Sequence, residues 1–477
     1  MSKLSILSLA AAAFLSGCSM IPTYERPAAP VAGQWPAEAA GMTVAAPGKA
    51  PTEVPWQSFF TDPQLQRLIE TALQNNRDLR VAVLNIEQAR AQFQIKRADQ
   101  FPTVNLGASG QKVTSSNSAT YSVGLVTSSW ELDFFGRVAS LKEAALAQYL
   151  ATEEARKSAQ ISLIASVAGG YIALLADREL LDLTEQTVNS RIESEKLAKL
   201  RFDNGVASEL DLRQAQSLTE TARAERARLT RLTAQDRNAL SLLVGQPLGA
   251  LGELSANASL GNTQLVNTLP PGLPSDVLLS RPDIRQAEQV MLANNANIGA
   301  ARAAFFPNIS LTVGAGTASS HFNDLFSGGT WGFTVAPQLM LPIFDAGRNQ
   351  ANLDSANAGR AIAQAQYEKA IQTAFREVAD ALAGQATFNE QLRALRAQVA
   401  ADEATYKLSD LRYKGGVASY LDLQVALRTL FTSQLAAVQT QQSQLLNQVE
   451  LYKALGGGWT EPPPAPQAKS VAENPAS

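Results

Sequence analysis

The 477-residue sequence is poor in the residues that most enzyme sites and disulfide scaffolds use. It has one histidine and one cysteine, which excludes catalytic or zinc clusters built on histidine and any disulfide within the chain. Aromatic residues make up 6% of the chain and charged residues 17%, whereas hydrophobic residues make up 45%. Alanine therefore supplies much of the apolar surface, which favours close packing of helices over a thick globular core.

Two further absences limit the partners and the route across a membrane. The formal net charge of −3 provides no basic footprint for nucleic acid. No run approaches the ~20 uninterrupted apolar residues of a membrane-spanning helix. Any membrane crossing must therefore use β-strands.

The N-terminus is typical of an exported lipoprotein. A basic residue precedes an apolar run from Leu4 to Leu15, too short to span a membrane, and small residues follow. Cys18 comes directly after Leu-Ser-Gly and resembles the bacterial lipobox, in which this cysteine is acylated after cleavage. We expect residues 1–17 to be a signal peptide and 18–57 to be an extension that begins at acylated Cys18. This covalent lipid is the only cofactor expected, and several acyl chains make a strong anchor.

The chain contains the same sequence pattern twice. Residues Lys196–Leu212 and Lys407–Leu423 align at an offset of 211, with eleven of seventeen positions identical. Residues Asp78–Leu106 and Asp283–Leu311 align at an offset of 205. Two copies are too few for a solenoid, so a closed ring of repeats fits better. We predict repeat 1 over 58–245, an equatorial linker over 246–272, repeat 2 over 273–456 and a largely disordered tail over 457–477.

Each repeat contains one predicted strand hairpin, at about 101–134 and about 306–345. Each begins after a Phe-Pro step, where proline fits the start of a strand because no ladder donor is needed there. Apolar and polar or small residues then alternate with a period of two, which predicts strands with one apolar face. Trp130 and Trp331 are candidate aromatics for a membrane interface.

Each hairpin is followed by a long segment without proline, Arg137 to about Asp203 and Arg348 to about Lys414. Each of these segments predicts about 100 Å of helix, at 1.5 Å per residue. The tip turns that follow contain Gly205 and Val206 in one repeat and Gly416 and Val417 in the other, and a serine caps each next helix. Return helices are expected from about Glu209 to Leu243 and from Tyr420 to Leu455.

Four strands are too few to close a barrel, and open sheet edges are not tolerated in hydrocarbon. Several copies of the chain must therefore contribute strands. Two copies would give eight strands around an interior filled with side chains, whereas three would give twelve strands and room for a channel. The ~100 Å helices would extend far beyond a hydrocarbon core of ~30 Å.

Several long motifs resemble the TolC-type outer-membrane efflux factors, most closely their OprM-like lipoprotein branch. The motifs are Trp130–Arg137 (WELDFFGR), Leu273–Glu288, Ala296–Leu311 and Leu451–Trp459 (LYKALGGGW). The resemblance implies an α+β fold in a homotrimer, with a twelve-stranded β-barrel, a long periplasmic α-helical barrel and an equatorial mixed domain. It also implies a lipid-anchored, passive duct in the outer membrane of a Gram-negative bacterium, and no enzymatic activity. The implied partners are a periplasmic adaptor (membrane fusion) protein and a resistance-nodulation-division inner membrane transporter.

In that family the periplasmic tip closes like an iris, through acidic and apolar rings on the helix after the second tip turn. The same stretch here starts at Tyr420 and departs from the pattern at Val425, where close relatives commonly have aspartate. A solvated helix end remains the alternative role for each of its charges. The predicted gate residues are Leu421, Asp422 and Arg428, with Asp211 and Arg213 supplying ion pairs in the first repeat.

Three classes of function remain to be separated. An exit duct requires two strand hairpins and two long helical hairpins in one chain, which is the predicted pattern. A specific outer membrane porin would need many more strands in one chain. An envelope-spanning structural lipoprotein would lack the alternating strand hairpins.

Overall fold

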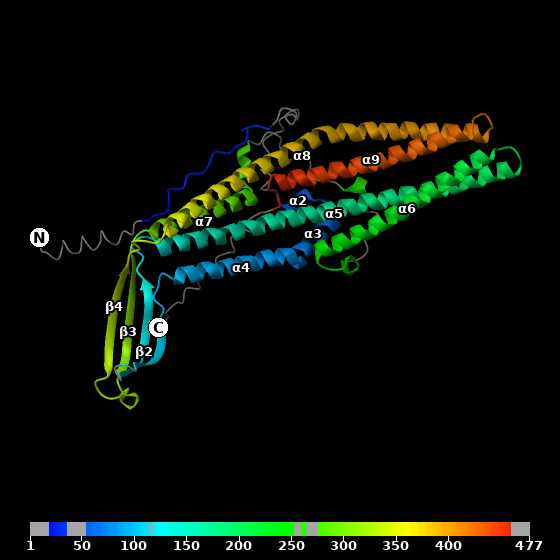
Figure 1. Cartoon of the computed structure of the whole chain (residues 1–477). Coiled ribbons are helices and arrows are strands. Elements are labelled where there is room, and N and C mark those ends of the chain that lie inside the picture. Colours follow the sequence, from blue (N-terminus) through cyan, green and yellow to red (C-terminus); the bar gives the residue numbers. More distant parts are fainter. Residues whose placement is uncertain are drawn as a thin grey trace, which may run out of the picture. The chain divides into compact units, whose positions relative to one another are not determined.

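The computed structural model describes residues 19–35, 54–113, 115, 118–251, 259–263, 265 and 275–458. The chain is mostly helical and contains one four-stranded antiparallel sheet (Figure 1). It divides into two compact units. The first contains the sheet, α7 and the first parts of α5 and α8, and the second contains the remainder of these two helices with α6 and α9. The signal peptide, Cys18 and the tail after Gly458 lie outside the described residues.

The same order of elements occurs twice along the chain. The elements of the first half are α2 (Trp56–Phe59), α3 (Pro63–Asn75), α4 (Arg77–Ala98), β1 (Asn105–Val113), β2 (Ser118–Glu131), α5 (Arg137–Asp203) and α6 (Glu209–Val244). Those of the second half are α7 (Pro282–Ala303), β3 (Asn308–Ser319), β4 (Trp331–Met340), α8 (Arg348–Lys414) and α9 (Tyr420–Ala454). The order helix, two strands and two long helices is thus shared, which confirms the predicted two-fold repeat. The bounds of α5 and α8 are those predicted from the sequence, and α6 and α9 end within one residue of the prediction.

The two repeats end their return helices in the same geometry but with different side chains. Asn76 donates its side-chain N–H to the carbonyl of Leu243 at 2.9 Å. Arg281 lies 205 positions after Asn76 and donates to the carbonyl of Ala454 at 2.6 Å. A left-handed glycine stands two residues after each of these carbonyls. The last carbonyls of a helix have no partner inside the helix. Each repeat therefore supplies a side-chain donor at this position, an amide in the first repeat and a guanidinium in the second.

The core of the second unit includes an aromatic cluster around Tyr452. The ring of Phe59 stacks on that of Tyr452 with centroids 4.0 Å apart, and Phe60 packs edge-on at 5.9 Å. The buried Tyr452 hydroxyl donates to the carbonyl of Val54 at 2.7 Å, so its polar end is satisfied. This cluster joins the segment around α2 to the end of α9.

One helix among the described residues, α5, is long and apolar enough to cross a membrane by length and composition. However, 61% of its most apolar window is buried inside the structure. Ile164, Val167, Ala168 and Ile172 are almost fully buried there. A helix in a protein core can have the same length and apolar composition, and the burial of α5 is that of a core helix.

Two carboxyl groups face each other between α5 and α6. Burial and, next, the neighbouring carboxylate of Asp177 raise the pKa of Asp236 to about 6. Burial also raises the pKa of Asp177, against the opposing effects of its hydrogen bond with Asp236 and of the Arg228 charge. One oxygen of Asp236 is enclosed without a hydrogen-bond partner in the described structure. The pair therefore favours holding one proton between its members.

We predict that Asp236→Asn stabilises the protein at neutral pH. A carboxyl whose pKa is raised on folding stabilises the folded state below its unfolded pKa, near 3.8, and loses that contribution as pH rises through about 6. Because both groups are partly exposed, solvent screening reduces the effect to on the order of 1 kcal/mol. Thermal unfolding of the detergent-solubilised protein between pH 4 and pH 8 measures it. A wild-type midpoint that is flat over this range would contradict the shared proton.

Candidate functional site: strand faces, joint and helix tips

The sheet joins the two repeats side by side. Strands β1 and β2 form one antiparallel hairpin and β3 and β4 another, as predicted, and β2 pairs with β3 in the middle. The strand order is therefore β1-β2-β3-β4, with β1 and β4 at the edges. The outer edge of each edge strand has no strand partner within the described chain.

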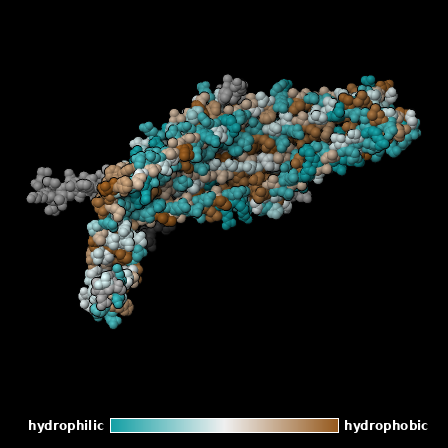
Figure 2. All heavy atoms as spheres, in the orientation of Figure 1, coloured by the Kyte–Doolittle hydropathy of each residue, from teal (hydrophilic) through white to brown (hydrophobic). Residues whose placement is uncertain are grey.

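The two faces of the sheet differ in chemistry. One face carries small and polar side chains, including Asn105, Ser109, Ser122, Ser310, Thr312 and Thr334, and the other carries Leu106, Val123, Leu125, Leu311, Phe333, Val335 and Leu339. The apolar face is exposed, since Leu106 is 77% and Leu339 64% accessible. In Figure 2 the visible part of the sheet is mostly pale or brown, whereas the helices show many teal residues. An exposed apolar sheet face indicates contact with lipid or with another protein.

A β-bulge in β2 changes which face of the sheet its last side chains point to. Thr127 pairs with Val313, but the next partner pair is Trp130 with Leu311, so β2 has one residue more than β3. Ser129 within the bulge has a positive φ of 48°. Because side chains alternate along a strand, the extra residue turns Trp130 onto the apolar face, beside Leu311. Sequence alternation alone does not reveal the bulge.

One glycine from each strand lies on a single rung of the sheet. The rung comprises Gly107, Gly124, Gly316 and Gly332. A Cβ atom on Gly124 would stand 2.5 Å from the carbonyl oxygen of Ala315, and one on Gly316 would stand 2.3 Å from that of Val123. The two central strands therefore approach too closely here for any side chain. Both Cβ positions point to the polar face, so the backbones close in on that side, as on the inside of a curved sheet.

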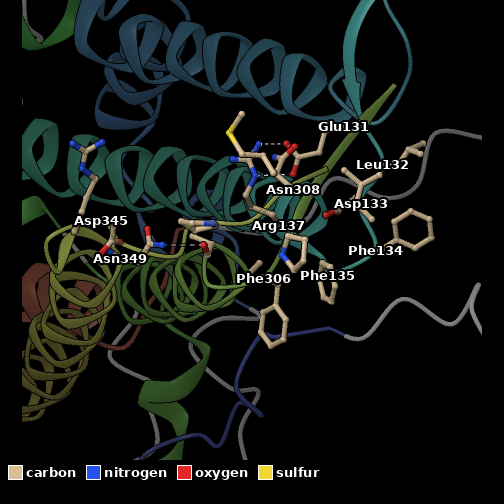
Figure 3. Close-up of a pocket in the computed structure, with 17 residues that line it drawn as sticks. Glu131, Leu132, Asp133, Phe134, Phe135, Arg137, Phe306, Asn308, Asp345 and Asn349 are labelled. Carbon is tan, nitrogen blue, oxygen red and sulfur yellow. Dashed lines mark hydrogen bonds and ion pairs between the residues drawn. The ribbon is translucent and has the colours of Figure 1, made fainter. Parts of the chain in front are cut away.

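The starts of the two longest helices are capped where the strands give way to helix (Figure 3). Asp133 accepts the backbone N–H of Ala139 at 2.6 Å, in the first turn of α5. Asp345 accepts the backbone N–H of Asn349 at 2.8 Å, in the first turn of α8. Backbone hydrogen bonds to Asp345, first that of Asn349 and then that of Gly347, lower the pKa of Asp345. Sequence analysis missed both caps, although an aspartate just before a helix is a recognised start signal.

The caps line a cavity of about 340 Å³ together with an ion pair and two stacked rings. Arg137 donates two hydrogen bonds to the Glu131 carboxylate, at 2.8 and 2.5 Å. The rings of Phe135 and Phe306 stack with centroids 4.8 Å apart. The aspartates here cap the starts of the two helices, and Arg137 pairs with Glu131. These charged groups therefore stabilise the connection between strands and helices, and we call the arrangement a structural joint. No cluster of metal-binding residues occurs in the described part of the chain.

The two tip turns have the same backbone geometry, as the repeated motif predicts. Gly205 and Gly416 adopt left-handed conformations, with φ of 72° and 75°. In each turn the next residue donates its N–H back into the helix, to the carbonyls of Arg201 and Arg412 at 2.9 and 3.0 Å. This six-to-one hydrogen bond ends both long helices in a Schellman motif.

Both return helices start with a reciprocal capping box. Ser208 accepts the N–H of Asp211 at 3.1 Å, and Asp211 accepts the N–H of Ser208 at 3.2 Å. Ser419 and Asp422 repeat this pattern at 3.2 and 3.1 Å. The serine caps were expected, but the role of the aspartates in them was not. Each predicted gate aspartate therefore also holds a helix start.

The predicted gate residues Leu421 and Arg428 lie on the tip surface, together with Val425 and the turn valines. Leu421 is 57% and Val425 46% exposed, and the turn valines Val206 and Val417 are exposed above 70%. Arg428 is exposed and forms no ion pair with any described residue. These positions are accessible for contacts with other chains.

Arg213 has an ion-pair partner on its own helix. Its guanidinium pairs with Glu209 at 3.1 Å within one chain and not with Asp211, which is held in the capping box. Residues four apart share one face of a helix, whereas residues two apart do not.

The sequence profile of the family described as outer membrane efflux protein matches residues 68–246 and 273–457. The chain belongs to this family.

Similar proteins and structures extend over nearly the whole chain. A probable efflux pump outer membrane protein of Pseudomonas putida, TtgC, is 49% identical, and OprJ of Pseudomonas aeruginosa is 44% identical, each with 96% of both chains covered. The crystal structure of the open state of the Neisseria gonorrhoeae MtrE channel has a TM-score of 0.82 and 40% identity, covering 92% of this chain and 98% of that one. A membrane protein from Pseudomonas aeruginosa has a TM-score of 0.84 and 43% identity, covering 93% and 98%. This outer membrane efflux protein thus has the α+β channel fold of its family and is a transport duct, not an enzyme.

We predict that Asp422→Asn raises the conductance of the efflux protein in a planar bilayer. The amide keeps an acceptor for the capping box and removes the charge assigned to the gate, so the helix start should survive. Asp211→Asn makes the same change at the other predicted gate aspartate. Ser419→Ala is the control, since it should cost ~1 kcal/mol of stability through the cap alone and leave the Asp422 charge in place. Conductance of Asp422→Asn identical to wild type would remove this residue from the gate.

Proposed function

We propose that three copies of this chain form the passive outer membrane exit duct of a tripartite efflux pump. The observation that carries the proposal is a sheet with an exposed apolar face and two edges without strand partners in the chain. In hydrocarbon each unsatisfied backbone group costs several kcal/mol, so the edges of β1 and β4 must pair with neighbouring copies.

The number of copies follows from the size of barrel that leaves room for a channel. Two copies would give eight strands around an interior that side chains fill, whereas three give twelve strands around a channel. The polar face, with its glycine rung, then lines a wet lumen, and the apolar face meets lipid. A porin made of one chain does not fit, because the described chain supplies only four strands.

The long helices support a duct that continues beyond the membrane. Each of α5 and α8 has 67 residues, or about 100 Å of helix, against a hydrocarbon core of ~30 Å. The partners are a periplasmic adaptor protein and a resistance-nodulation-division transporter, which select and drive the cargo. Related Pseudomonas putida proteins are named for toluene, solvent and antibiotic efflux, and we assign the same broad class of toxic, partly apolar compounds to this duct.

The segment that follows Cys18 supports a lipid anchor beside the sheet. Arg26 forms an ion pair with Glu288 of α7 at 2.7 Å, and the Tyr24 hydroxyl donates to the same carboxylate at 2.8 Å. These contacts fasten the extension to the helix that leads into β3.

Closer to Cys18, the segment follows α7 toward its end. Asn295 donates to the carbonyl of Pro22 at 2.7 Å. Ile21 lies so close to Gly299 that a Cβ there would stand 2.9 Å from the Ile21 nitrogen. The chain therefore runs toward the strands as it approaches Ser19, and an acylated Cys18 would be delivered on the side where β3 begins.

Deletion of the gene tests the proposed duct. Intracellular accumulation of several unrelated dyes should rise, because compounds loaded by the pump lose their exit, and the wild-type gene should restore export. Envelope integrity and expression of the pump are the controls. Unchanged accumulation would overturn the efflux proposal, and reduced accumulation would favour a porin.

Mass spectrometry of the purified mature protein tests the anchor. The N-terminal peptide should begin at Cys18 and carry acyl chains, whereas Cys18→Ala should leave an uncleaved or unacylated protein that washes from membranes more readily. An unmodified Cys18 in the wild-type protein would contradict the anchor while leaving the duct untouched.

A further inference from the structure

At the tips, the α8/α9 hairpin is seated on the α5/α6 hairpin of the same chain. The buried residues of this contact are Ala198 and Ala215 on one side and Tyr413, Tyr420, Leu423 and Leu427 on the other. All are at most 7% exposed. We call the receiving surface on α5 and α6 the filled socket.

Arg201 closes the filled socket over the entering hairpin. Its guanidinium lies over the Tyr413 ring, 4.3 Å from the centroid, and donates to the Tyr413 carbonyl at 3.2 Å. That carbonyl also accepts the N–H of Gly416 at 3.1 Å, so both of its lone pairs are used. Deeper in the same contact, the buried Arg191 lies over the ring of Phe431.

The repeat places an equivalent surface on the α8/α9 hairpin, and in the described chain that surface is empty. At the offset of 211, Ala198, Arg201 and Ala215 correspond to Ser409, Arg412 and Ala426. These three line a cavity of about 490 Å³ together with Asp402, the counterpart of Arg191. We call it the empty socket.

Two polar groups of the empty socket, on Arg412 and Asp402, lack partners of the kind that their counterparts Arg201 and Arg191 have. Arg412 is exposed, and its guanidinium has no hydrogen-bond, ion-pair or ring partner among the described residues. One oxygen of Asp402 is enclosed without a hydrogen-bond partner. Enclosed polar groups are normally satisfied, so this surface is built for contact.

We propose that the empty socket receives the α5/α6 tip of a second copy of this chain, with Arg412 lying over Phe202 of that copy. Phe202 corresponds to Tyr413 at the same offset, and the residue is 38% exposed. Its carbonyl accepts the N–H of Gly205 at 2.9 Å, which leaves one lone pair for an arginine. The arginine contact within one chain is thereby repeated between chains.

A second copy fits better than another protein because the chain already shows what such a socket holds. The filled socket holds a tip with the same turn, the same capping box and eleven of seventeen identical residues. A ring in which hairpins of the two kinds alternate lets every socket be filled. The inference rests on the proposed trimer and adds the residues by which its tips join.

The contact between copies should be more polar than the contact within a copy. Tyr420 and Leu427, which enter the filled socket, correspond to Glu209 and Gln216 in the tip that would enter the empty one. Leu212 keeps the apolar character of Leu423. Charged and amide side chains retain water at such a contact, so the tips of neighbouring copies separate more readily than the two tips of one copy.

Cysteine pairs and a short bis-maleimide cross-linker test the inference on the full-length protein. Leu212→Cys with Ser409→Cys should link different chains, because their counterparts meet in the filled socket. Arg201→Cys with Tyr413→Cys is the matched control, because Arg201 covers the Tyr413 ring at the edge of the filled socket, and it should link residues within one chain. The exposed pair Phe202→Cys with Arg412→Cys serves as a second test pair that disturbs no buried residue, and wild type and single-cysteine variants set the background.

Denaturing gels should show linked dimers and trimers for both test pairs, several-fold above the single-cysteine variants. The control pair should leave the chain at monomer size with its maleimide sites consumed. If the control links and neither test pair links chains, the proposed occupant is wrong. Sedimentation of the wild-type protein separates the two levels: a monomer would overturn the trimer itself, whereas a trimer without tip cross-links would overturn only this contact.

Discussion

The structure depends on the need of every backbone N–H and C=O group for a partner where water is absent. Within the described chain, β1 and β4 each leave one edge without a strand partner, and the sheet exposes apolar side chains on one face. A sheet of this kind is tolerable in water only at a cost and is not tolerable in lipid. In the proposed duct, closure through neighbouring copies removes the edges, so the membrane itself would set the oligomeric requirement.

The same constraint governs the ends of the long helices. Each 67-residue helix starts at an aspartate that accepts a first-turn N–H and ends in a left-handed glycine that returns an N–H to the last turn. Each return helix begins in a serine–aspartate box. Helices this long can carry a duct across a compartment only if their ends are fixed, since fraying would begin there. Asp211 and Asp422 at the tips therefore have a capping role in addition to their predicted role in the gate.

Duplication explains how one chain can furnish both sides of a ring contact. Backbone geometry is kept between the repeats, whereas side chains at equivalent positions have diverged, as with Asn76 and Arg281 or Arg191 and Asp402. Shared backbone geometry lets two hairpins pack within a chain, and in the proposed ring the same packing would recur between chains. In that ring, the divergent side chains would make the contact between chains more polar, and therefore weaker, than the contact within a chain.

The sequence by itself determined the strands, the long helices, the tip turns and the repeat, because periodicity, proline and glycine act within a few residues of one another. It could not supply the β2–β3 pairing, the bulge at Thr127–Trp130 or the glycine rung, since these join residues about 190 positions apart. It also assigned Asp211 and Asp422 to the gate without their capping bonds, and it did not single out Glu209 as the partner of Arg213. Only tertiary structure decided these points, because strand register and side-chain contacts depend on backbone positions that the local pattern does not fix.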